Sequence, residues 1–284
     1  MKKHNGRKGL QLIHEVDATE VPYGCLAVWF LGQESVIVKG DGVTLYIDPY
    51  VSQNQDRTYP PAIAPEDINN AEVCLITHDH EDHLDKVAFP WIIRNNPSIK
   101  VMAPAICKSQ LVELGMKEEQ YLLAETEKWS TIGPKLQVLP VAAAHEQLDL
   151  DEQGNPHYVG YIIQLNGVTF YHAGDTVLFP ALIETVASHD IDLALLPING
   201  RDYFRNARNI VGNMNYREAA EFAAVAGFET VIPLHYDVFA GNAEHPGYFV
   251  DYLYQHFPEQ KFHVMARAER FVYVSQSAFK ATEE

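Results

Sequence analysis

A dense group of metal-ligating side chains constrains this chain more than any other feature. The short apolar run Cys74–Ile76 predicts a buried strand, and the nine residues that follow it, Thr77–Asp85, contain three histidines and four acidic residues. So many imidazoles and carboxylates at one strand end would destabilise one another without a cation to share. Imidazole nitrogen and carboxylate oxygen are ligands that zinc, manganese and iron accept. The segment therefore predicts a metal site.

The spacing within this segment favours two metal positions. His78 and His80 are two residues apart, so in an extended run their side chains face the same point. Asp82 and His83 enter the following turn and can face a second point nearby. Two cations about 3.5–4 Å apart fit such an arrangement.

Three further candidate ligands stand at the ends of apolar runs. His145 ends LQVLPVAAAH, Asp175 follows VTFYHAG, and His235 ends TVIPLH. Singly, each could be an ordinary loop histidine, turn aspartate or core histidine. Their shared position favours a site, because a sheet scaffold presents its functional groups on the loops that follow its strands. Asp48, in YIDPY, is expected to brace the first ligand loop rather than to bind metal.

Strand-like and helix-like stretches alternate in two similar halves, and no low-complexity linker separates them. We expect one domain at residues 21–284, after an N-terminal extension at residues 1–20, with two packed sheets and helices outside them. The expected strands, besides Cys74–Ile76, are Leu26–Leu31, Ser35–Val38, Val43–Ile47, Lys100–Met102, Leu136–Val141, Tyr158–Leu165, Val168–Tyr171, Asp192–Leu196, Thr230–Leu234 and Phe271–Ser275. The expected helices are Leu84–Asn95, Pro104–Leu114, one that begins near Asn215, and Pro246–His256.

Composition narrows the classes of partner. The net charge is −17, which disfavours nucleic acid and anionic lipid as partners. The hydrophobic content of 47% is typical of a globular protein. No apolar run comes close to eighteen residues, so we expect no membrane span. Three scattered cysteines fit a reducing compartment, so we expect a cytoplasmic location.

The order H-x-H-x-D-H, a later His, an Asp after Gly and a late His resembles the metallo-β-lactamase superfamily. The segments WFLGQESVIV, THDHEDHLD, YHAGD, IDLALLPIN and VIPLHYDVF most resemble its L-ascorbate-6-phosphate lactonase branch. The resemblance implies an α/β fold, a four-layer αβ/βα sandwich with mixed sheets and with the metals at one edge of the sheets.

The resemblance also implies a division of the ligands between two divalent transition-metal ions, Mn²⁺ or Zn²⁺, with iron also compatible. The expected sets are His78, His80 and His145 for one metal, Asp82, His83 and His235 for the other, and Asp175 as a bridge. The implied reaction is hydrolysis by a water molecule that the metals activate, with Asp82 as the catalytic proton acceptor.

A basic loop suggests the substrate class. Residues 199–214 follow an expected strand and carry Arg201, Arg205 and Arg208 in an otherwise acidic protein. Arginine suits phosphate or carboxylate, so we expect Arg201 and Arg205 to bind an anionic group, although a solvated loop is the ordinary alternative. Asn199 and Tyr203 are expected to hydrogen-bond to a sugar. The favoured function is hydrolysis of a small phosphorylated lactone or ester, with a sugar phosphate as the substrate.

Other functions use similar ligands. A phosphodiesterase or nuclease of the same fold is the first alternative, and the acidic charge counts against it. A diiron redox protein is an alternative from another class, but diiron oxygen reductases of this fold place Glu where this chain has His80. A non-catalytic metal-binding protein is the last. The sequence leaves open the identity of the metal and whether the chain forms a homo-oligomer.

Overall fold

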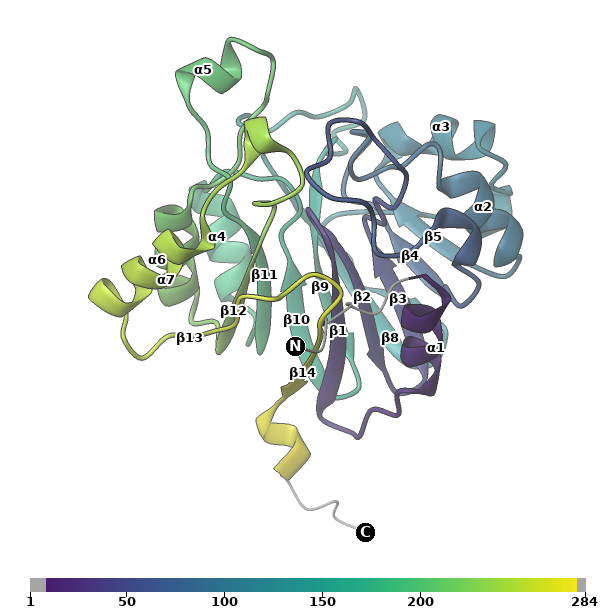
Figure 1. Cartoon of the computed structure of the whole chain (residues 1–284), viewed down its shortest axis with the longest axis horizontal. Helices are drawn as coiled ribbons and strands as arrows, with labels where there is room; N and C mark the ends of the chain where they lie inside the picture. The colour runs from purple at the N-terminus through teal and green to yellow at the C-terminus, as the bar shows by residue number, and fades with distance from the viewer. Residues whose placement is uncertain (1–8, 280–284) are drawn as a thin grey trace, which may run out of the picture.

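The computed structural model describes residues 9–279, which form two seven-stranded sheets packed face to face (Figure 1). The first sheet has the order β14 (Arg270–Val274), β1 (Cys25–Gly32), β2 (Ser35–Gly40), β3 (Val43–Ile47), β4 (Val73–Leu75), β5 (Lys100–Ala103) and β6 (Tyr121–Leu123). The second has the order β13 (Lys261–Phe262), β12 (Thr230–Leu234), β11 (Leu193–Pro197), β10 (Val168–His172), β9 (Val159–Leu165), β8 (Leu136–Ala142) and β7 (Ser130–Ile132).

The apolar pattern of β1 shows why the sheets are covered on both faces. All eight residues of β1 are buried. Successive side chains of a strand point to opposite faces, and the two faces of β1 meet different cores. Val28 and Phe30 pack between the sheets, whereas Trp29 packs in a second core on the outer side of the first sheet. A strand that is buried on both faces has a continuous run of apolar residues in its sequence.

Helices form the two outer layers. The second core includes buried side chains of three helices, α1 (Leu10–Ala18), α2 (Phe89–Asn95) and α3 (Lys108–Glu113). The second sheet is covered by α4 (Pro180–Ala187), α6 (Tyr216–Ala226) and α7 (Pro246–His256), of which α6 contacts both of the others (Figure 1). Both sheets mix parallel and antiparallel pairs. The expected four-layer sandwich with mixed sheets is confirmed.

Two local sequence signals are confirmed in detail. The β9–β10 hairpin turns through Asn166 and Gly167, which both have positive φ angles (54° and 75°), as a two-residue hairpin turn requires. Helix α6 begins at an Asn215–Glu218 capping box, in which each side chain accepts a hydrogen bond from the other residue's backbone N–H.

The start of one expected helix differs from the prediction. The helix expected over Leu84–Asn95 begins only at Phe89. The Asp85 carboxylate accepts hydrogen bonds from the backbone N–H groups of Val87 and Ala88, and it also accepts from those of Val51 and Ser52. These bonds hold the residues before Phe89 in turns.

Part of the expected N-terminal extension is helical and integrated into the domain. Leu12, Ile13 and Val16 of α1 are buried in the second core, and residues 1–8 lie outside the described part of the chain. Among the described residues, no helix combines the length and the apolar character that crossing a membrane requires.

Candidate metal centre

The residues expected as ligands meet at one edge of the sandwich, on loops that follow strands of both sheets. The loop after β4 carries His78, His80, Asp82 and His83. The other three ligand candidates, His145, Asp175 and His235, follow β8, β10 and β12 of the second sheet. The site therefore joins the two sheets, which explains why its members are far apart in the sequence.

Thr77 and Asp48 shape the first ligand loop. The Asp48 carboxylate accepts a hydrogen bond from the Thr77 backbone N–H at 2.8 Å and one from the Thr77 hydroxyl at 2.6 Å. Asp48 and Thr77 follow the neighbouring parallel strands β3 and β4. The expectation that Asp48 braces this loop is confirmed by these contacts.

Asp175 is brought to the same edge by a tight turn after β10. Gly174 has φ 59°, and a Cβ atom added there would lie 2.8 Å from the Thr77 side chain and 3.0 Å from the Val159 carbonyl oxygen. Only glycine combines that backbone conformation with such a close approach. The turn thus carries Asp175 directly against the loop after β4.

The seven candidates form two groups of three around one carboxylate. Potential ligand atoms of His78, His80 and His145 lie within 4.8 Å of one another, as do those of Asp82, His83 and His235. Asp175 lies between the groups. Its Oδ1 is 3.4 Å from His83 Nε2, and its Oδ2 is 3.6 Å from His145 Nε2 and 3.3 Å from His235 Nε2.

Several buried polar atoms face the centre of this cluster without a partner. His78 Nε2, His83 Nε2 and Asp175 Oδ1 are buried and have no hydrogen-bond partner among the described residues. Such atoms are costly to bury unless a further group satisfies them. A divalent cation can accept lone pairs from imidazole and carboxylate together, and so satisfies all of these atoms. The residues present fit a pair of transition-metal ions.

The charge states of His78, His145 and the two aspartates suit that donor set, whereas the neighbouring carboxylates outweigh burial at His83 and His235 and raise the pKa of both rings while no cation is bound. Burial lowers the pKa of His78 and of His145, which favours neutral rings with free lone pairs. Burial alone would raise the pKa of Asp175, but His235 and His83 outweigh it and hold that pKa well below its usual range. The same balance, through His83 and His235, lowers the pKa of Asp82. Both aspartates are therefore carboxylates at neutral pH.

Three of the histidines have a hydrogen-bond partner at Nδ1, on the side of the ring away from the centre of the cluster. His83 Nδ1 lies 2.7 Å from Asp48 Oδ2, His78 Nδ1 lies 3.0 Å from Thr77 Oγ1, and His145 Nδ1 lies 3.1 Å from the Gly212 carbonyl oxygen. Contacts of this kind fix the ring and the tautomer of a metal-ligating histidine, so that Nε2 faces the cation.

A cavity of about 660 Å³ opens over the cluster. Its floor contains five of the ligand candidates: His80, Asp82, His145, Asp175 and His235. Ile210, Val211 and Phe239 give it apolar walls, and Asp56 and Glu81 add acidic groups. None of the described residues that line it is a lysine or an arginine. The cavity can take a small organic molecule, but its described lining offers no lysine or arginine to an anion.

The structure does not place the four expected substrate-binding residues in this cavity. Arg201 binds Glu218 through two hydrogen bonds, at 2.7 and 2.8 Å, and also donates to the Asn213 carbonyl oxygen. Arg205 pairs with Asp202 at 3.1 Å and donates to two backbone carbonyl oxygens.

The two neutral residues of that set also lie apart from the cavity lining. The Asn199 amide is buried and donates to Asn242 Oδ1. Tyr203 is 79% exposed and lies on the short helix α5 (Tyr203–Asn206), which protrudes from the body of the molecule (Figure 1). Loop 199–214 still reaches the cavity, but through Asn209, Ile210 and Val211.

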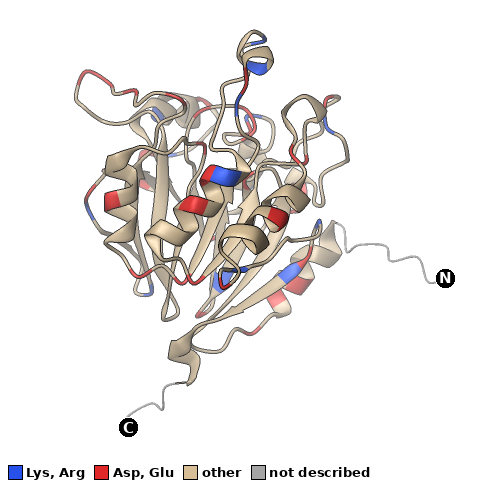
Figure 2. Cartoon of the chain, turned by 90° about the vertical axis from the view of Figure 1, so that its left-hand side faces the viewer, with Lys and Arg blue, Asp and Glu red and all other residues tan. Residues whose placement is uncertain are grey.

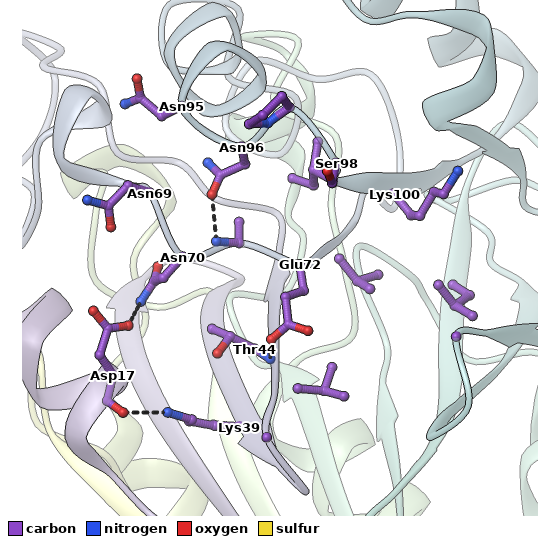
Figure 3. A pocket seen from close by; sticks show the side chains of 18 of the residues that line it. Asp17, Lys39, Thr44, Asn69, Asn70, Glu72, Asn95, Asn96, Ser98 and Lys100 are labelled. Atoms are coloured by element: carbon purple, nitrogen blue, oxygen red, sulfur yellow. Dashed lines mark hydrogen bonds between the residues drawn. The ribbon is translucent and has the colours of Figure 1, made fainter.

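A larger cavity, of about 710 Å³, lies where strands β3, β4 and β5 begin, whereas the candidate metal centre lies beyond the ends of β3 and β4; Figure 3 shows residues that line this cavity. Several of its polar side chains bond to the protein itself. Lys39 donates to the Asp17 carbonyl oxygen, Asn70 donates to the Asp17 carboxylate, and Asn96 accepts from the Ala71 N–H. None of the described residues that line it carries a buried side-chain polar atom without a partner. Volume alone therefore does not identify the functional site.

Residues 44–236, which include all seven ligand candidates, match the family model described as "Beta-lactamase superfamily domain". The chain is 33% identical over 229 residues to a UPF0173 metal-dependent hydrolase of Pyrococcus furiosus, a match that covers 78% of this chain and 89% of the relative. It is 31% identical over 233 residues to a UPF0173 metal-dependent hydrolase of Thermococcus kodakarensis, with the same coverage of 78% and 89%. A solved structure described as a novel metallo hydrolase from Ignicoccus hospitalis matches with a TM-score of 0.69 and 25% identity, over 88% of this chain and 98% of that one.

Proposed function

We propose that this chain, which belongs to the beta-lactamase superfamily, is a metal-dependent hydrolase that holds two divalent transition-metal ions and cleaves a small lactone or ester. The position of Asp175 is the observation that carries the proposal. One carboxylate touches histidines of both three-ligand groups, as a ligand that bridges two cations must.

Each group of ligands has a distinct task in the proposed site. His78, His80 and His145 would hold one ion, Asp82, His83 and His235 the other, and Asp175 both. Ions bound there would lower the pKa of water toward neutrality and polarise the substrate carbonyl. The lowered pKa of Asp82 and its position in the cavity lining support a role as the acceptor of the proton that water releases.

The lining of the cavity favours a substrate without a remote phosphate. A phosphate held away from the cations would lie near Asp56 and Glu81 and would find no arginine or lysine among the described lining residues. Ile210, Val211 and Phe239 instead suit an uncharged carbon skeleton. A neutral lactone or carboxylic ester meets these conditions better than the phosphorylated lactone expected from the sequence.

The charge distribution also disfavours the nuclease alternative. Figure 2 shows basic and acidic segments interspersed over the face toward the viewer rather than a continuous basic stripe. A polyanion depends on such a stripe for most of its binding energy. The acidic net charge of −17 acts in the same direction.

A substrate panel tests the proposal. Protein stripped with a chelator and reloaded with Mn²⁺ or Zn²⁺ would be assayed on neutral lactones and esters, on their phosphorylated counterparts and on a phosphodiester. We expect the highest kcat/KM on a neutral lactone or ester. A preference for the phosphodiester would overturn the proposed reaction, and a preference for phosphorylated lactones would overturn the interpretation of the cavity.

A further inference from the structure

Gln33 lies beside the candidate metal centre, although its backbone belongs to the turn between β1 and β2. Its side chain is buried, and its Nε2 donates a hydrogen bond to Asp82 Oδ2 at 2.7 Å. The same Nε2 lies 3.1 Å from His235 Nε2. Because an ionised carboxylate can only accept hydrogen bonds, the amide nitrogen and not its oxygen must face Asp82. Gln33 thus contacts two members of one ligand group.

His235 lacks an outer partner of the kind that three of the other ligand candidates have. His78, His83 and His145 are held through Nδ1 by Thr77, Asp48 and Gly212, whereas His235 Nδ1 is buried without a hydrogen-bond partner among the described residues. Outer partners usually set the orientation of a ligating side chain. Gln33 is such a partner for Asp82, and its carbonyl oxygen also holds the His235 backbone.

The turn that carries Gln33 is fixed on both sides. Its backbone has φ 59°, and its carbonyl oxygen accepts a hydrogen bond from the His235 N–H at 2.9 Å. The preceding Gly32 has φ 106°, and a Cβ atom there would lie 2.3 Å from Tyr59 Oη. Tyr59 in turn donates to Asp237, which also accepts from the Gln33 N–H. The amide of Gln33 is therefore held in place rather than free to swing.

We propose that Gln33 is a positioning residue for the metal position formed by Asp82, His83 and His235, and that it leaves the position formed by His78, His80 and His145 unaffected. The proposal rests on the proposed function, because it assumes two metal positions. A cation bound by His235 would use the same Nε2 lone pair that now faces Gln33. With a cation present, Gln33 would act through its hydrogen bond to Asp82.

Gln33→Met tests this role, because methionine has a similar length but no hydrogen-bond donor. Gln110→Met is a matched control. Gln110 Nε2 donates at 2.9 Å to Asp79, in the same ligand loop but outside both ligand groups, and its Oε1 is buried and unpartnered, like that of Gln33. Zinc would be titrated calorimetrically into chelator-stripped protein. We expect Gln33→Met to weaken one of two binding steps by about 10–100-fold, the usual effect of losing an outer partner, and Gln110→Met to weaken neither.

Combining Gln33→Met with a substitution in either ligand group identifies which zinc-binding step is affected. In His145→Ala protein, Gln33→Met should still weaken zinc binding, whereas in His235→Ala protein it should add little. Gln33→Asn, which keeps the amide but withdraws it by one methylene group, should weaken the same step as Gln33→Met. The metal-free Gln33→Met and Gln110→Met proteins should melt at the same temperature.

Other results would overturn the assignment. Equal weakening of both steps, with a lower melting temperature for metal-free Gln33→Met, would show a purely structural role. Unchanged binding of two zinc ions by Gln33→Met would show that Gln33 has no role at the metals. Failure of the unmutated protein to bind two zinc ions would count against the proposed function instead.

Discussion

His83 is held from behind by Asp48: its Nδ1 lies 2.7 Å from Asp48 Oδ2, and both side chains are fully buried. Because this carboxylate can only accept a hydrogen bond, it fixes the proton on Nδ1 and leaves Nε2 to face the centre of the cluster. Asp48 also accepts two hydrogen bonds from Thr77, so one side chain fixes both the conformation of the ligand loop and the orientation of the His83 ring.

Asp48→Asn should move the ring proton of His83 to the other nitrogen with little change in side-chain volume. An asparagine amide can donate to His83 Nδ1 and so place the ring proton on Nε2, the atom that must ligate metal. We expect metal affinity to fall by about 10–100-fold, measured by competition with a chromophoric chelator. Asp79→Asn, in the same loop but outside both ligand groups, is the control and should bind metal normally. Equal affinities for the two variants would contradict the bracing role of Asp48.

Asp175→Ala should reduce occupancy at both metal positions, because its carboxylate lies against histidines of both ligand groups. Elemental analysis after dialysis should find two ions per chain in the unmutated protein and fewer than one in the variant. His145→Ala provides the comparison, since His145 belongs to one group only. If Asp175→Ala kept one ion at full occupancy, Asp175 would be a ligand of a single metal.

Asp82→Asn should lower kcat by about 10²–10⁴-fold at saturating metal, the usual scale for losing a general base. The change preserves shape and removes the charge that allows the carboxylate to accept a proton. Glu81→Gln is a matched control, because Glu81 is the neighbouring residue and lines the same cavity but belongs to neither ligand group. An unchanged kcat for Asp82→Asn would remove Asp82 from proton transfer.

Arg201→Ala should affect stability rather than substrate recognition. Its guanidinium binds Glu218, a member of the α6 capping box, and the Asn213 carbonyl oxygen. We expect the free energy of unfolding to fall by about 0.5–1.5 kcal/mol in chemical denaturation, with kcat/KM unchanged on phosphorylated and neutral lactones alike. Arg217→Ala, on the exposed side of α6, should change neither quantity. A selective loss on the phosphorylated lactone would restore Arg201 as a substrate-binding residue.

Local sequence patterns predicted the elements, and suggested the candidate ligands, whose signals are contained in one segment. The continuous apolar run of β1 and the Asn215–Glu218 capping box depend on neighbouring residues, and the strand and the helix start that they predict are both confirmed. The ligand loop is similarly local, because His78, His80 and His83 have few explanations other than a metal. Its distant partners, His145, Asp175 and His235, were recognisable from their position at strand ends and their order in the chain.

Contacts between distant segments account for what the sequence did not reveal. Gln33 is one polar residue in a tight turn, and its importance arises only where that turn meets His235, 202 positions later. Arg201 and Arg205 suggested an anion site because their partners, Glu218 and Asp202, cannot be assigned from composition. Helix α1 was not predicted, since so short a helix depends on packing against the first sheet for its stability.

The most direct test of the account is a zinc titration of chelator-stripped protein, followed in parallel by calorimetry and by hydrolysis of a neutral lactone. Stripping should leave the fold largely intact, because two extensive apolar cores hold the sandwich together. We predict no hydrolysis without metal, two zinc ions bound per chain, and a rate that becomes maximal only when the second is bound. A stripped protein that keeps its full hydrolytic rate, or one that binds no zinc, would contradict the assignment of the seven ligands as the catalytic centre.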